Sequence, residues 1–182
     1  MLSNIRHKAK NIFSELGYPS TKNEMWKYTN VKSFNNYIAV HSNQSDYQLK
    51  DFPLSNNSFN IILCNGQLIT KDIKIEGVKI TDYENLLNSS FPSENFLQIS
   101  NFNDNGITAH NTSAFSDALH ITIDKNKNID TPINIISISN NSDSNKIIFP
   151  RIYIHSKKNS SASIHIQHIS EGRRRSSARI CS

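Results

Sequence analysis

Four groups of alternating apolar residues in the second half of the chain constrain its fold more than any other feature. In each group isoleucine or leucine alternates with polar residues, which predicts a short strand with one buried face. The strand centres are Ile121, Ile135, Ile152 and Ile166, which follow one another at similar intervals along the chain. Such regular short strands are typical of a sandwich, a barrel or a β-helix, and the spacing alone does not choose among these folds.

Size and composition exclude several classes of protein. The chain has 182 residues, the size of one domain, and its low mean hydropathy of -0.51 is wrong for a bundle of membrane helices. Cys64 lies inside an apolar run, where we expect a buried thiol, and Cys181 lies next to the last residue. Because neither has a partner at metal-ligand spacing, the sequence disfavours a disulfide scaffold and a structural zinc or iron-sulfur site.

The first residues predict an amphipathic helix over residues 3–16. Apolar residues recur there every three or four positions, and Arg6 and the nearby basic residues are expected on the remaining, exposed surface. Gly17 and Pro19 give the helix a stop. Because no apolar run of a secretory signal follows, and because Glu15 and the stop argue against a transit peptide, we expect a cytoplasmic protein.

A dense motif follows this helix. Thr21 and Glu24 have the spacing of a capping box, which predicts a short helix that begins at Thr21. Trp26, the only tryptophan, is expected to anchor a small domain with its ring buried between polar neighbours. The full segment reads Gly17-Tyr18-Pro19-Ser20-Thr21-Lys22-Asn23-Glu24-Met25-Trp26-Lys27-Tyr28-Thr29.

This segment resembles the N-terminal signature of SufD-type iron-sulfur cluster assembly proteins. The similarity continues more weakly along the chain to about Ser170, through residues 59–69, 109–115, 119–133 and 149–168. It implies an α+β, mainly β fold, in which an N-terminal helical region with a hairpin precedes the first rungs of a right-handed parallel β-helix. The implied divisions are 1–118 for the N-terminal region, 119–170 for the start of the β-helix and 171–182 for a basic tail.

The resemblance also implies a function. SufD-like proteins are non-catalytic scaffold subunits that pair with a SufB-like homologue and a SufC-like ATPase, and the intact complex assembles the iron-sulfur cluster. In that family the ATPase-docking segment and the cluster-related residues belong to the C-terminal half. We therefore expect an N-terminal fragment that holds no cofactor, does not recruit the ATPase and associates with itself through its open β-helix end.

Between the two halves, turn and cap signals predict three further elements. Asn65-Gly66 predicts a hairpin between strands at residues 59–64 and 67–69. Thr81 and Glu84 have capping-box spacing ahead of a short helix, and residues 107–118 predict another helix. The apolar residues stand at odd-numbered positions before Glu76-Gly77 and at even-numbered positions after it. An inserted bulge or a tight bend would cause this change.

The net charge of +5 is concentrated at the end of the chain. Four arginines lie among the last twelve residues, whereas the rest of the basic residues are almost all lysines. This change in composition favours a vector-derived or out-of-frame extension that begins near Gly172, and an authentic basic tail is the alternative. Because the remaining charge is nearly balanced, we expect neither nucleic acid nor a membrane as a partner.

No catalytic, cofactor-binding or metal-binding residue is assigned. The chain lacks phosphate-binding loops, nucleophile elbows and paired cysteines. His120, His155 and His165 are expected on the strand face opposite the isoleucines, and His168 on the other face. The first three could be metal ligands, but we expect them to be scattered, solvated side chains. Lys157, Lys158 and Arg151 are a candidate anion patch, although we expect the two lysines to be ordinary solvated side chains of a turn.

One alternative function stays open. A β-solenoid module that acts on or binds polysaccharide would share the strand pattern. Such a module usually presents acidic clusters and stacked aromatic rings, whereas the strands from Leu119 to Ile169 carry Tyr153 as their aromatic residue, apart from Phe149 at a strand start.

Overall fold

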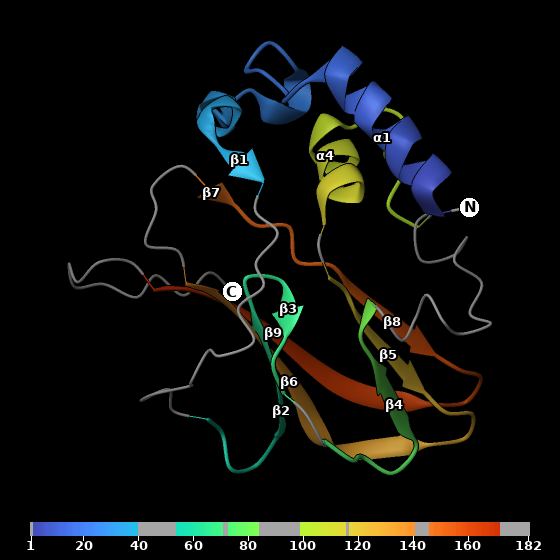
Figure 1. Ribbon diagram of the computed structural model, residues 1–182. Helices are drawn as coiled ribbons and strands as arrows, with labels where there is room; N and C mark the ends of the chain where they lie inside the picture. Colours follow the sequence, from blue (N-terminus) through green and yellow to red (C-terminus); the bar gives the residue numbers. More distant parts are fainter. Residues whose placement is uncertain are drawn as a thin grey trace.

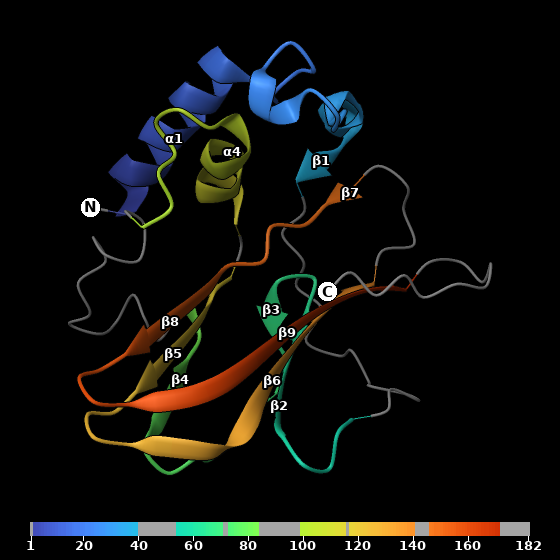
Figure 2. The same cartoon turned by 180° about the vertical axis from the view of Figure 1, so that it is seen from behind.

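The computed structural model places a helical layer above a stack of strands (Figures 1 and 2). It describes residues 2–39, 54–70, 73–83, 99–115, 117–140 and 146–171. Along the chain these elements are α1 (Leu2–Leu16), η1 (Glu24–Trp26), η2 (Lys32–Asn36), β1 (Ile38–Ala39), β2 (Phe59–Cys64), β3 (Gln67–Leu68), β4 (Val78–Thr81), α4 (Gly106–Ala114), β5 (Leu119–Ile123), β6 (Asn128–Asn140), β7 (Lys146–Ile147), β8 (Ile152–Ser156) and β9 (Ser161–Glu171). None of the described helices is long and apolar enough to cross a bilayer.

Helix α1 confirms the predicted amphipathic helix and its stop. Gly17 adopts a left-handed conformation (φ 61°), and its N–H donates to the carbonyl of Phe13 at 2.8 Å. This is the usual way for a glycine to end a helix. Ala9 is completely buried against Phe102 and Ala109, so the apolar stripe of α1 packs on α4.

The short helix predicted at Thr21 is wrong. The chain makes a single 3₁₀ turn, η1, and the side chain of Asn23 accepts a hydrogen bond from the N–H of Met25 at 3.2 Å. Asn23 is as good a cap as threonine and lies directly before the turn. The capping box therefore does not form, and no residue of η1 is buried.

The predicted hairpin is confirmed. β2 and β3 pair antiparallel, and both turn residues have positive φ angles, 50° for Asn65 and 87° for Gly66. These are the conformations of a type I′ turn, which the Asn-Gly pair favours. Gly77 (φ 77°) forms the tight bend that the parity switch predicted, with Ile75 bridged to Val78.

Helix α4 is shorter than predicted. It begins after Asn105, whose side chain accepts from the N–H groups of Ile107 and Thr108, and it ends at Ala114 rather than at Ala118. Phe115 leaves the helix in an extended conformation and its side chain is completely buried. Burial of this ring outweighs one more turn of helix. The helix predicted after Thr81 lies almost wholly outside the described residues.

The strands after residue 118 form two parallel layers. β5 pairs with β8, and Leu119 aligns with Ile152. β6 pairs with β9, and the register shifts between Ile129 and Ile133, so that Ile133 aligns with Ile164. Pro132, which cannot donate to a ladder, lies in that shift. Each layer is thus a strand, a short turn and a second strand.

The turns of the two layers lie on one another. Asn126 (φ 60°) and Asn159 (φ 57°) both adopt the left-handed conformation, and the amide of Asn159 donates to the side-chain oxygen of Asn126 at 3.2 Å. Asparagine tolerates this conformation better than most residues. Two layers do not by themselves establish a solenoid, so the right-handed β-helix stays a prediction.

The main core lies between the two sheets of this stack. One sheet has the order β3-β2-β6-β9 and the other β4-β5-β8. Their inward side chains include Ile61, Leu63, Leu119, Ile121, Ile133 and Ile135, all completely buried. Strands from before and after residue 118 share this core, and the division into domains at that residue stays a prediction.

Candidate functional site

The histidines of the strands do not converge on one site. His120 on β5 is buried, not solvated as expected, with Nε2 3.1 Å from the hydroxyl of Thr122 and its ring 5.1 Å from that of Tyr153. Burial lowers the pKa of His120, and electrostatic repulsion from His155 and Lys79 adds to the effect. The imidazole is therefore kept neutral in the fold.

The other candidate ligands remain apart. His155 and His165 are exposed, on β8 and β9, which belong to different sheets. Across the described ranges no group of three or more histidine, cysteine or acidic side chains lies close enough to hold a metal ion. Cys64 is buried, as predicted, at the end of β2.

The candidate anion patch does not form. Arg151 is 8% exposed, and its guanidinium donates to the side-chain oxygens of Asn111 at 2.9 Å and Thr112 at 3.0 Å. Lys157 instead pairs with Asp124 at 2.7 Å on the surface. Burial, helped by the nearby Arg6, lowers the pKa of Arg151 to about 10, so this arginine stays charged at neutral pH and ties α4 to the segment before β8.

A junction of polar and aromatic side chains joins the helical layer to the strands. Arg6 is half-buried, rather than exposed as expected, and its guanidinium carbon lies 4.4 Å from the ring centroid of Phe115, with that of Arg151 at 5.3 Å. Arg6 also donates to the backbone carbonyl of Phe115. The sequence contains a signal for this burial. Arg6 lies three residues before Ala9, so it is on the same face of the helix as the apolar stripe.

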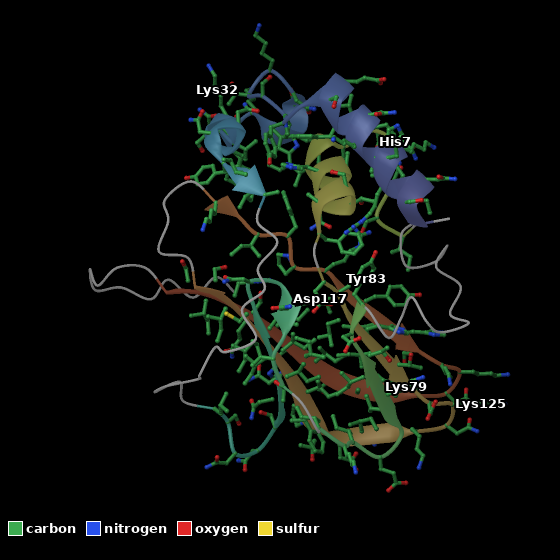
Figure 3. All side chains as sticks on the ribbon, in the orientation of Figure 1. His7, Lys32, Lys79, Tyr83, Asp117 and Lys125 are labelled. Atoms are coloured by element: carbon green, nitrogen blue, oxygen red, sulfur yellow. The ribbon has the colours of Figure 1, made fainter. Side chains whose placement is uncertain are left out.

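Asp117 fixes the backbone on the strand side of the junction. Its carboxylate accepts from the N–H groups of Leu68 at 3.2 Å, Tyr83 at 3.1 Å and Ala118 at 2.7 Å. Figure 3 shows Asp117 and Tyr83 in the region between the helices and the strands. The carboxylate thus ties the backbone at Leu68 and at Tyr83 to the start of β5. Sequence analysis missed this residue, because Leu68 and Tyr83 are distant along the chain.

A second aromatic cluster lies between α1 and α4. The hydroxyl of Tyr18 lies 2.5 Å from Nδ1 of His110, and the imidazole stacks on Phe13 with 4.1 Å between ring centroids. The ring centroid of Phe149 lies 4.6 Å from that of the imidazole, with the two rings tilted by 59°. Burial lowers the pKa of His110 and raises that of Tyr18, so the pair is neutral near pH 7.

The signature turn, residues 23–28, faces solvent. Met25 is 88% and Tyr28 92% exposed, and Trp26 is half-buried, so the expectation of a buried tryptophan anchor holds only in part. The ammonium group of Lys27 lies 5.5 Å from the centroid of the Tyr28 ring. The exposed side chains of the signature turn can make contacts with another molecule. The junction formed by Arg6, Phe115 and Arg151, in contrast, is structural.

Comparison with known protein families gives a match that includes this segment. The family described as SufBD protein N-terminal region matches residues 1–135, which include the signature turn, α4 and the first strand layer up to the middle of β6. No curated protein matches the chain.

Proposed function

Because the chain belongs to the SufB/SufD family through its N-terminal region, and so to the SUF system of iron-sulfur cluster assembly, we propose that it is a non-catalytic scaffold subunit of that system. The observation that carries the proposal is the family match, which spans most of the chain. The partners would be a SufB-like homologue and a SufC-like ATPase, and the compartment would be the cytosol.

The parallel strand layers support a scaffold built on a β-helix. Each strand of the second layer lies parallel to its counterpart in the first, in which Ile121 and Ile135 are completely buried. Further layers of the same kind would lengthen the stack into a stiff platform. In this proposal the cluster is the cargo of the whole complex, and this chain contributes shape and contact surface.

Purification from the native cells tests the proposal. The protein is tagged at Met1, expressed from its own locus and isolated at low salt. We expect the SufB-like protein to be recovered with it, and the SufC-like ATPase to be recovered through that homologue and not by direct binding to this chain. The complex should form a cluster detectable by its visible absorption when iron, sulfide and ATP are supplied. The protein alone should hydrolyse no ATP.

Two results would contradict the scaffold assignment. One is recovery of the tagged protein without either SUF subunit. The other is specific binding in a glycan screen, which would favour the polysaccharide module instead. Cell fractionation checks the cytosolic location independently.

A further inference from the structure

The signature turn carries exposed apolar side chains on a hydrogen-bonded backbone. Met25 lies within the 3₁₀ turn and Tyr28 lies two residues after its last residue, and both side chains are exposed. Three backbone hydrogen bonds hold the turn: Trp26 to Asn23 at 2.8 Å, Lys27 to Glu24 at 3.3 Å and Thr29 to Trp26 at 3.0 Å. A partner would therefore meet a surface that needs little ordering when it binds.

The composition of this face is that of a protein interface. A single exposed apolar residue is ordinary, but here two large ones, 88% and 92% exposed, flank a half-buried tryptophan. Methionine, tyrosine and tryptophan are enriched where proteins meet. We name Met25, Trp26 and Tyr28 the apolar platform.

The charges around the platform are unlike those of the rest of the molecule. Residues 2–39 carry six lysine or arginine side chains and two glutamates, whereas residues 40–171 carry ten basic and thirteen acidic side chains. Lys22, Lys27 and Lys32 are exposed and lie within four residues of the platform along the chain. Figure 3 shows Lys32 on the helical layer, far from Lys79 and Lys125 on the strand layers.

From this combination we propose that the apolar platform and its three lysines dock an acidic polypeptide segment that carries an apolar side chain. The apolar side chain packs on Met25 and Tyr28, and carboxylates of the partner pair with Lys22, Lys27 and Lys32. Glu24 lies within the turn and would repel any anionic group placed over it, so the carboxylates of the partner lie toward the lysines and its apolar side chain toward the turn. The apolar stripe of α1 is buried against α4, so it offers no second contact to a bilayer.

The test measures binding of a fluorescein-labelled peptide in which glutamates flank a Leu-Phe pair, by anisotropy with the full chain at low salt. The platform variant carries Met25→Ser and Tyr28→Ser, and the charge variant carries Lys22→Gln, Lys27→Gln and Lys32→Gln. Each is expected to bind about tenfold more weakly than the unchanged protein. All five side chains are exposed, so both variants should keep the unfolding midpoint of the parent.

Matched controls separate docking from general attraction. Lys74→Gln, Lys79→Gln and Lys125→Gln remove the same charge from exposed positions elsewhere, and Ile99→Ser removes another exposed apolar side chain. Both should weaken binding by less than about threefold. A peptide with glutamine in place of glutamate should bind at least about tenfold more weakly.

Several outcomes overturn the proposal. They are an equal loss in the distant lysine variant, no loss in the platform variant, and no peptide binding at all. Tighter binding of phosphatidylserine vesicles or of a single-stranded RNA, with the same dependence on the platform, would assign this face to a membrane or to nucleic acid. The result does not depend on the scaffold proposal, because no SUF subunit takes part.

Discussion

His110 illustrates how much one side chain joins at the residue scale. It lies on α4, accepts or donates at Nδ1 toward the Tyr18 hydroxyl, stacks on Phe13 and contacts the tilted ring of Phe149. Such a ring contributes most when it is neutral, because the surrounding aromatic side chains give no compensation for a charge. The stability of the packing of α1 on α4 is therefore expected to depend on pH.

We predict that acidification destabilises the protein through His110. Its pKa is lowered from the ordinary value of 6.5 in the fold, so its contribution is complete above that value and is lost as the pH falls through the lower folded pKa. Urea unfolding at about pH 7.5 and about pH 5 should show a fall in the free energy of unfolding. The fall should be smaller in His110→Gln than in the parent, and unchanged in the control His7→Gln on the exposed side of α1. An identical fall in His110→Gln would contradict this account.

At the scale of elements, α4 begins unusually close to the end of α1. A Cβ atom added at Gly106 would overlap the carbonyl oxygen of Gly17, and backbone cannot move aside as a flexible side chain does. The close approach therefore requires a residue without a side chain at position 106, where the backbone of Gly17 comes near. This contact was outside what the pattern of apolar residues could predict, because it depends on the separation of two backbones.

The substitution Gly106→Ala tests this close approach. Helix propensity alone would favour alanine by about 1 kcal/mol. The clash should reverse the sign, with a net loss of about 2 kcal/mol in the free energy of unfolding measured with urea. The control Gly17→Asn meets nothing within 4 Å and keeps a residue that tolerates positive φ, so it should cost less than about 1 kcal/mol. A stabilised Gly106→Ala protein would show that the helices can separate freely.

The accuracy of the sequence-based expectations differs between elements for physical reasons. The hairpin at Asn65-Gly66 and the stop at Gly17 were predictable, because their backbone conformations depend on the residues themselves. The end of α4 was not, because burial of Phe115 and the three hydrogen bonds to Asp117 compete with helix extension. The surface location of the signature turn was missed for a related reason: the motif shows apolar residues, and only packing decides whether they are covered.

At the scale of the whole molecule, the two strand layers end on an edge. Ile61, Ile135 and Ile166 align across β2, β6 and β9, and the first two are completely buried whereas Ile166 is 43% exposed. β8 and β9 are edge strands of their sheets. The outer edge of a sheet beside a partly exposed isoleucine favours pairing with another edge.

We therefore predict that the 182-residue chain associates with itself through β8 and β9. Sedimentation velocity over a range of concentrations should show dimers or larger species. Ile166→Lys should shift the population toward monomer by about tenfold in the dissociation constant, since a charge at an edge opposes pairing. Ile99→Lys, which changes an exposed isoleucine outside the sheets, should have no such effect. A monomer at every concentration, with a cooperative melt, would argue against an open edge.

The sequence by itself determined the local conformations, the strand pattern and the family. Turn residues, helix stops and alternating isoleucines act over a few positions, and the signature of residues 17–29 is contiguous. Only the tertiary structure decided which residues meet across the chain: Arg6 with Phe115, Asp117 with three separate amides, and the Asn126 turn with the Asn159 turn. These contacts depend on chain register and on competition for burial, which no short stretch of sequence contains.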